Sequence, residues 1–531
     1  MLQTVRSTRG MAVAPHTLAA QAAVDILRAG GNALEAMVAA ASTIAVVYPH
    51  MNSFGGDGFW TISCPGKPVV AIEACGPAAS SVSTEYYTAK GYKKIPTRGP
   101  DSANTIAGAI GGWQAALELS KEWGGKLPLG RLLENAIFYA KDGIPVSRSQ
   151  MIATTKKLDE LKPIPGFAET FLVDGKVPQP GDRMRFEPLG RTLQALADDG
   201  LDSFYRGRIA ESIAKELKAL GSPISAEDLA KYRAQIRTPL VLEHSLGQIY
   251  NLTPPTQGLV SLMILGIVDR LGIDRFTAES AEYVHCVVEA TKQAFMIRDR
   301  HITDLDHMDI DPQSLLSPEH IDKLTSAVSM DAALPWGQGK GPADTVWMGV
   351  IDGEGRAVSF IQSIYHEYGS GIVLSDTGIN WQNRGCSFSL DPQHINALAP
   401  NKKPFHTLNP ALARLNDGRV MVYGTMGGDG QPQTQAAVFT RYAVYNQTVQ
   451  AAITSPRWLL GRTWGEDTDS LKLEGRFPEE TCRKLKALGH DVEMVDNFDE
   501  IVGHAGAIVH YPNGVFEGGS DPRSNGGVAS F

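Results

Sequence analysis

Residues 343–352 read Ala-Asp-Thr-Val-Trp-Met-Gly-Val-Ile-Asp and follow a loop rich in glycine and proline, residues 334–342. Successive side chains of a strand point to opposite faces, and both faces of this segment are largely apolar. The pattern therefore predicts a strand that is buried on both sides. The turn sequence Asp-Gly-Glu-Gly at 352–355 predicts a hairpin whose returning strand runs from Arg356 to Gln362. Thr345 is thus expected at the head of a core strand, where a loop meets a rigid element.

Two interpretations of Thr345 follow from this position. Threonine favours β-structure, so the residue could simply open the strand. It could instead be a nucleophile, if the chain is cut just before it. The new α-amine would then lie beside the hydroxyl and act as its general base. An α-amine has a reference pKa of about 7.7–8.0, which suits proton transfer near neutral pH. The local pattern favours the first interpretation, and the rest of the chain favours the second.

The composition is typical of a globular protein, and the cysteine pattern suits a reducing compartment. The chain has 531 residues, and its 49 basic and 58 acidic residues give a net charge of −9, which argues against a nucleic-acid partner. No secretory start and no apolar run of membrane-spanning length is visible, so a cytoplasmic protein without a membrane partner is expected. The five cysteines form no C-x-x-C pair, and no metal or cofactor is expected. They are Cys64, Cys75, Cys286, Cys386 and Cys482.

Hydrophobic periodicity and capping signals, such as Asn32 before the helix 33–47, predict a mixture of strands and helices. The expected strands are 11–14, 59–63, 68–74, 419–424, 507–510 and 515–517, and the expected helices are 16–28, 33–47, 105–123, 129–141, 259–271, 278–298, 432–445 and 479–488. A helical lobe is expected at about 147–245 and a flexible linker at 329–344. His285 and His301 lie on or near the helix 278–298, and helical histidines are more often packed or solvated than ligands, so neither is given a role.

Two glycine-rich turns stand out. Gly55-Gly56-Asp57-Gly58 precedes a strand, where glycine permits a close backbone approach or a positive φ. Gly427-Gly428 lies between the strand 419–424 and the helix 432–445. Free N–H groups at such a strand-to-helix turn can stabilise an oxyanion. A plain tight turn explains the second pair equally well.

Taken together, these features resemble the γ-glutamyltranspeptidases of the N-terminal-nucleophile hydrolase superfamily. The resemblance covers nearly the whole chain and rests on the order and spacing of motifs that are individually weak. The motifs are residues 25–33, 55–59, 344–345, 350–358, 368–373, 401–404, 427–428, 455–458 and 520–524.

The resemblance implies an α+β fold, a four-layer αββα sandwich made as one precursor. Cleavage at the Asp344–Thr345 bond would give a large subunit, residues 1–344, and a small subunit, residues 345–531, with a dimer of these heterodimers as a further assembly. Thr345 would be the nucleophile and its own N-terminal base. The family places a second hydroxyl beside the nucleophile, which is Ser363 here. Its oxyanion hole corresponds to Gly427 and Gly428.

The departures from the family concern its clamp for an α-amino acid. The family's carboxylate-binding arginine has no counterpart in residues 75–83. Positions that accept the α-amine in the family are Tyr365, Arg384 and Ser387 here, and a serine pair is replaced by His406-Thr407. These changes predict a small anionic amide without an amine as the substrate, since an unpaired ammonium in such a site would cost several kcal/mol.

We therefore expect Tyr365, Arg384, His406 and Thr407 to bind the substrate, with Arg384 gripping a carboxylate. His406 and Arg523 are the alternative cations. Three other functions remain open at this stage. They are a γ-glutamyl hydrolase or transpeptidase with an altered clamp, an acylase of the cephalosporin or glutaryl type, and an inactive binding scaffold on the same fold.

Overall fold

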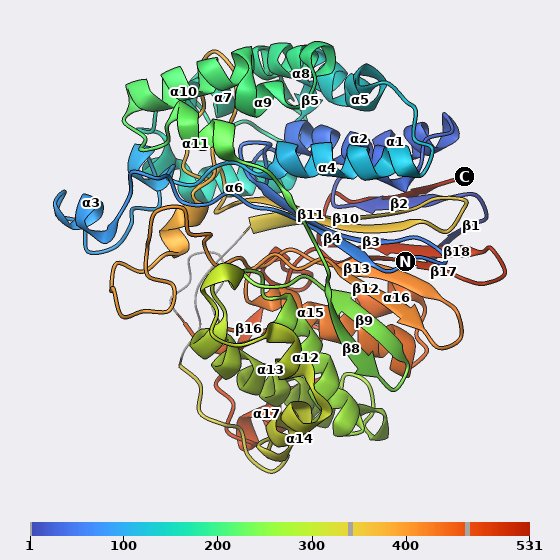
Figure 1. Ribbon diagram of the computed structural model, residues 1–531. Coiled ribbons are helices and arrows are strands. Elements are labelled where there is room, and N and C mark those ends of the chain that lie inside the picture. The colour runs from blue at the N-terminus through green and yellow to red at the C-terminus, as the bar shows by residue number, and fades with distance from the viewer. Residues whose placement is uncertain (1–2, 338–343, 462–467) are drawn as a thin grey trace.

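The computed structural model describes residues 3–337, 344–461 and 468–531, with only the backbone of Asp344. Within these ranges, two seven-stranded antiparallel sheets are stacked face to face, with helices on both outer sides (Figure 1). The first sheet has the order β19 (Gly527–Ser530), β2 (Met11–Ala14), β10 (Asp344–Ile351), β11 (Ala357–Tyr365), β3 (Asp57–Ser63), β4 (Val70–Ala74) and β7 (Gln235–Arg237). The second has the order β1 (Val5–Ser7), β18 (Phe516–Ser520), β17 (Gly506–His510), β13 (Val420–Gly424), β12 (Ala411–Leu415), β9 (Gly247–Asn251) and β8 (Leu240–His244). This is the predicted αββα sandwich.

The helices form two outer layers and a lobe. The first sheet is covered by α1 (Thr17–Arg28), α2 (Ala33–Val47) and α4 (Ala109–Glu122). The second is covered by α12 (Gly258–Arg270), α13 (Ala281–His301), α15 (Gly430–Phe439) and α16 (Val449–Thr454), with α14 (Pro318–Ser326) outside them. Beyond and beside the first layer lie α5 (Leu129–Asp142), α6 (Arg148–Leu161), α7 (Phe167–Phe171), α8 (Glu187–Asp199), α9 (Ser203–Arg206), α10 (Arg208–Leu220) and α11 (Ala226–Lys231). The smaller elements are α3 (Thr84–Thr88), α17 (Glu479–Ala487), the pair β5 (Ile144–Pro145) and β6 (Arg183–Met184), and the sheet of β14 (Trp458–Leu460), β15 (Leu471–Glu474) and β16 (Val492–Val495).

Strand β10 is buried on both faces, as predicted. Val346, Met348 and Val350 pack into the core between the first sheet and its helices. Trp347 and Ile351 pack into the separate core between the two sheets. The hairpin is also confirmed, because β10 and β11 pair in antiparallel register across the turn that follows Ile351.

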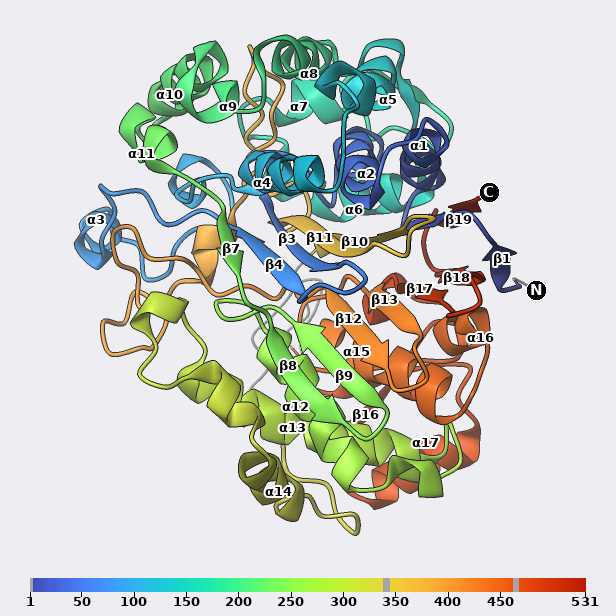
Figure 2. The same cartoon turned by 45° about the vertical axis from the view of Figure 1, so that its right-hand side comes forward.

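Both sheets interleave strands from before and after Thr345. In the first sheet, β2 lies between β19 and β10, and β3 pairs with β11. In the second sheet, β1 pairs with β18, and β9 pairs with β12. Figure 2 shows β1 and β19, the first and last strands in chain order, on the same side of the molecule. The backbone hydrogen bonds of both sheets therefore join residues on either side of position 345.

Helix α2 explains how the inner layer fits against the sheet. Its 15 residues are all buried. The predicted cap at Asn32 is confirmed, since its side chain accepts hydrogen bonds from the backbone N–H groups of Leu34 (3.0 Å) and Glu35 (3.1 Å). The Glu35 carboxylate accepts from the Asn32 N–H in return, at 2.9 Å. The two bonds form a capping box that satisfies donors at the buried helix start.

Two helices begin three or four residues later than predicted. The expected helix 278–298 starts at Ala281, after its cap Ser280. The expected helix 105–123 starts at Ala109 instead. Thr105 forms a β-bridge with Ala78, and the N–H of Gly108 donates to the carboxylate of Asp57 at 3.0 Å. Thr105 and Gly108 thus contact other segments of the chain before the helix begins. Apolar periodicity within the segment does not reveal such contacts.

The described half of the predicted linker, residues 329–337, contains neither helix nor strand. It is nevertheless held by hydrogen bonds. The N–H of Ala333 donates to the carbonyl of Leu488 at 2.7 Å, and the N–H of Leu334 donates to Glu289 at 3.1 Å. Residues 338–343 of the linker lie outside the described ranges. None of the described helices combines the length and apolar character that a membrane span requires.

Candidate active site

Thr345 occupies an irregular position at the start of β10. Asp344 pairs with Tyr365 and Val346 with Gln362, so the register shifts and Thr345 lies opposite two residues of β11, Ser363 and Ile364, across a β-bulge. Bulges often redirect a side chain beside an active site. Thr345 is completely buried, and its Oγ1 has no hydrogen-bond partner among the described residues.

Ser363 lies on the neighbouring strand, within this bulge and opposite Thr345. It pairs in register with Asp57 on β3, and its Oγ accepts a hydrogen bond from the N–H of Tyr365 at 2.9 Å. Tyr365 has a positive φ of 81°, which is uncommon for a residue other than glycine. The predicted second hydroxyl is therefore in the strand beside Thr345, next to a strained residue.

The glycine turn at 427–428 is brought to the same end of β10 by the stacking of the sheets. Gly349 lies against Val422, and Gly424 lies against the indole of Trp347, so β10 and β13 cross in opposite directions. A Cβ on Gly424 would be only 2.2 Å from Trp347 Cδ1, which requires glycine there. The chain leaving β13 at Gly424 therefore reaches Gly427 near the Thr345 end of β10.

Both turn glycines have positive φ, 114° for Gly427 and 52° for Gly428. Neither N–H donates a hydrogen bond to a described residue. The turn is fixed by its other groups. Gln257 Nε2 donates to the carbonyls of Gly428 and Thr407, at 2.8 Å each. The resulting geometry suits a preformed oxyanion hole.

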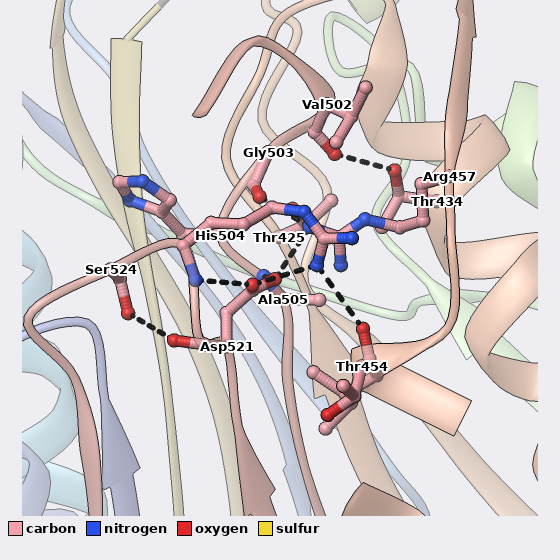
Figure 3. Close-up of polar contacts among 12 residues, drawn as sticks. Thr425, Thr434, Thr454, Arg457, Val502, Gly503, His504, Ala505, Asp521 and Ser524 are labelled. Atoms are coloured by element: carbon pink, nitrogen blue, oxygen red, sulfur yellow. Dashed lines mark hydrogen bonds and ion pairs between the residues drawn. The ribbon is translucent and has the colours of Figure 1, made fainter. Parts of the chain in front are cut away.

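Two buried ion pairs flank this turn. Arg298 Nη1 donates to Asp429 Oδ1 at 2.7 Å, and both side chains are fully buried. On the other side, Arg457 Nη2 donates to Asp521 Oδ2 at 2.6 Å and to the carbonyl of Gly503 (Figure 3). Gly503 in turn packs directly against Met426, so this network supports the turn from behind.

Arg384 is the main cation of the site. It lies in a short 3₁₀ segment, Arg384–Ser387, and its guanidinium stacks 4.0 Å from the ring centre of Tyr365. Arg384 is only 1% exposed, yet none of its three guanidinium nitrogens has a hydrogen-bond partner among the described residues. A buried, unpaired cation is costly unless an anion joins it.

The two alternative cations are less suitable. Arg523 already binds Glu474 at 2.6 Å and Asp521 at 3.0 Å. Burial is the main cause that holds the pKa of His406 well below its usual range, and the charges of Arg384 and Lys403 lower it further. This imidazole is therefore neutral. Of these three candidate cations, Arg384 is therefore the one that can bind a ligand, because its nitrogens have no hydrogen-bond partner among the described residues.

His406 and Asp57 lie next to each other, and the charge of Arg384 acts on both. His406 Nε2 is 3.5 Å from Asp57 Oδ2, and His406 packs edge-on against Phe59. Asp57 is missing from the site residues predicted from the sequence. The sequence feature that could have identified Asp57 is its position inside the glycine run 55–58. In the structure, Gly56 approaches the carbonyl of Ser363 so closely that a Cβ on Gly56 would lie 2.1 Å from it.

Thr407 follows His406, and its Oγ1 is also buried without a partner among the described residues. The predicted site residues thus come together from β10, β11, the Arg384 segment, the segment before β12 and the turn after β13. Of the predicted cleavage site, the backbone of Asp344 is described, as part of β10.

Other candidate sites contain none of these residues. The ligand atoms of His285, Glu289 and His490 lie within 4.8 Å of one another. They already have partners, because His285 and His490 hydrogen-bond each other at 2.7 Å and Glu289 pairs with Lys292 at 2.7 Å. A cavity of about 560 Å³ lies between the helical lobe and residues 373–378, and its lining is largely apolar. The buried polar cluster around Arg384 is the better candidate for chemistry.

Comparisons with known proteins agree with this arrangement. The family model described as gamma-glutamyltranspeptidase matches residues 19–531. The oxamate amidohydrolase proenzyme of Klebsiella pneumoniae is 60% identical over 526 residues, which covers 99% of each chain. The glutathione hydrolase-like YwrD proenzyme of Bacillus subtilis is 41% identical over 532 residues and covers 100% of each chain.

Among solved structures, the cephalosporin acylase from Bacillus halodurans matches with a TM-score of 0.91 at 33% identity. The match covers 100% of this chain and 97% of the acylase. Since the family model and these relatives span almost the entire sequence, the chain belongs to the γ-glutamyltranspeptidase family.

Proposed function

We propose that this protein is a precursor that cleaves itself between Asp344 and Thr345 and then hydrolyses oxamate to oxalate and ammonia. Residues 1–344 form the large subunit and residues 345–531 the small subunit in this account. The Klebsiella relative is named for oxamate and as a proenzyme, which supports both parts of the proposal.

The observation that carries the substrate assignment is the buried, unpaired guanidinium of Arg384. A guanidinium binds a carboxylate through two parallel hydrogen bonds. Oxamate has one carboxylate directly next to one amide. Arg384 stacks on Tyr365, and Tyr365 pairs with the residue before Thr345. A carboxylate held by Arg384 would therefore keep the adjoining amide at the nucleophile's end of β10.

In the proposed reaction, the α-amine of Thr345 accepts the hydroxyl proton while Oγ1 attacks the amide carbon. The N–H groups of Gly427 and Gly428 stabilise the resulting oxyanion. Cleavage of the C–N bond releases ammonia, which takes the proton from the α-amine, and leaves an ester on Oγ1. A water molecule, activated by the same amine, then hydrolyses the ester to release oxalate and restore the hydroxyl.

A second candidate is an acylase for a glutaryl-type side chain, which also ends in a carboxylate that Arg384 could bind. The close structural match to a cephalosporin acylase favours it. The two candidates differ in the distance between carboxylate and amide. Ammonia release from oxamate and from glutaramate, its homologue with three methylene groups between the two functions, decides between them.

The test of the proposal compares oxamate with pyruvamide, a neutral amide of similar size and shape. Arg384→Ala and Arg384→Lys should each lower kcat/KM for oxamate. The loss should correspond to a rise of about 2–4 kcal/mol in transition-state free energy, the usual effect of removing one partner of a buried charge pair. Turnover of pyruvamide should change far less. Cleavage of the precursor needs no substrate anion and should continue. If both amides lose activity equally, Arg384 is structural and the oxamate assignment fails.

A further inference from the structure

Asp57 is a buried carboxylate with a fixed orientation. It is the first residue of β3 and has no exposed surface. Its Oδ1 accepts hydrogen bonds from the N–H groups of Gly76 at 3.1 Å and Gly108 at 3.0 Å. Its Oδ2 has no hydrogen-bond partner among the described residues and faces His406 Nε2 at 3.5 Å. The two backbone donors therefore prevent the carboxylate from turning to follow a neighbouring group.

Arg384 is the charged group that acts on Asp57. The two charges interact through space, and each shifts the pKa of the other. In the described part of the chain, however, no hydrogen bond joins Asp57 to Arg384, and all three guanidinium nitrogens are unpaired. A ligand carboxylate can thus bind the guanidinium while Asp57 stays in place.

We propose that Asp57 determines specificity by limiting the negative charge that the Arg384 site accepts, so that the site holds a monoanion and releases a dianion. This inference rests on the proposed function, because the dianion in question is oxalate. Arg384 and ionised Asp57 cancel each other, so bound oxamate leaves one net negative charge and bound oxalate leaves two. Like charges in a poorly solvated site repel strongly. Asp57 therefore favours release of the product over release of the substrate.

Of the other titratable groups near Asp57, His406, Cys75, Tyr205 and Tyr232 are uncharged near neutral pH, and Lys403 and Glu73 form an ion pair with each other. Burial lowers the pKa of His406 and raises the pKa values of Cys75, Tyr205 and Tyr232. Burial also raises the pKa of Asp57 to about 7, although Arg384 and the hydrogen bonds to Asp57 oppose that rise. A bound anion raises this pKa further, so anion binding takes up a proton. Affinity for anions therefore falls as the pH rises through about 7, and more steeply for a dianion.

The experiment measures the binding of oxalate and pyruvate by titration calorimetry. Pyruvate is a monoanion shaped like oxamate that the enzyme cannot hydrolyse, so the result does not depend on turnover. Asp57→Asn removes the charge and keeps an oxygen for Gly76 and Gly108. At pH 8 the variant should bind oxalate at least about tenfold more tightly, and the gain for pyruvate should be clearly smaller. In the wild-type protein, the ratio of oxalate to pyruvate affinity should fall between pH 6 and pH 8.5, and in the variant it should stay constant.

Asp228→Asn is the matched control. Asp228 is also a buried aspartate that accepts two backbone hydrogen bonds, from Ser80 at 3.1 Å and Ser225 at 3.0 Å. This control should leave the ratio of the two affinities unchanged. The inference is overturned if Asp57→Asn changes both affinities by the same factor, if neither anion binds, or if the wild-type ratio is independent of pH. If the wild-type protein does not hydrolyse oxamate, the proposed function fails on its own. The two binding constants still test the inference, because they are measured without turnover.

Discussion

At the scale of single residues, the candidate site is marked by polar atoms that are buried and unpaired. Thr345 Oγ1, Thr407 Oγ1, both ring nitrogens of His406 and the guanidinium of Arg384 all lack hydrogen-bond partners within the described ranges. Buried polar groups of native proteins are nearly always paired, and the exceptions often serve function. A small substrate with several hydrogen-bonding groups, such as oxamate, would satisfy several of these atoms at once.

Ser363 provides a test at this scale. Ser363→Ala should lower kcat for ammonia release by about tenfold or more, because removing one partner of a buried hydrogen bond costs about 1–3 kcal/mol. In the proposed reaction Ser363 supports the nucleophile and does not bind the carboxylate, so the loss should appear in kcat. Steady-state kinetics together with a melting curve measure both effects. Turnover at the wild-type rate would remove Ser363 from the catalytic machinery.

At the scale of elements, the crossing of β10 and β13 assembles the site. The contact between Trp347 and Gly424 brings the turn at Gly427-Gly428 to the Thr345 end of β10. The indole of Trp347 also donates a hydrogen bond to Ser359 Oγ at 2.9 Å, which fixes its orientation. The distance between the two sheets at this point therefore sets where the Gly427-Gly428 turn lies relative to Thr345.

Gly424→Ala tests that crossing. The new methyl group would overlap the buried indole, and overpacking of a core costs about 1–3 kcal/mol. We expect a lower free energy of unfolding, measured in urea, and a lower kcat because the turn is displaced. The matched control is Gly130→Ala on α5, where a Cβ would meet no atom within 4 Å. In that helix alanine should be neutral or stabilising. Equal stability of the two variants would contradict the proposed crossing.

At the scale of the whole molecule, the interleaved sheets explain how a cleaved chain stays together. Strands before and after position 345 alternate in both sheets, so cutting one peptide bond breaks none of the pairings between them. The two subunits should therefore co-elute under native conditions after cleavage. They should separate only when the sheets themselves unfold.

The sequence was sufficient for features that depend on local pattern and motif order. The buried strand at 344–351, its hairpin partner and the cap at Asn32 follow from alternation, turn residues and capping chemistry. The contributions of Asp57, Gln257 and Arg298 were not predicted, because each depends on contacts between segments far apart in the chain. The start of α4 was misplaced for the same reason, since Gly108 binds Asp57 instead of entering the helix.

In the proposed mechanism, Thr345 becomes the N-terminal nucleophile by cutting its own precursor. The most direct measurement is the mass of the purified chain under denaturing conditions, for the wild-type protein and for Thr345→Ala. The wild-type protein should give two fragments, the smaller of which begins with Thr345. The variant should give one inactive chain of 57.2 kDa. Two fragments from the variant, or an intact wild-type chain that still releases ammonia from oxamate, would contradict the account.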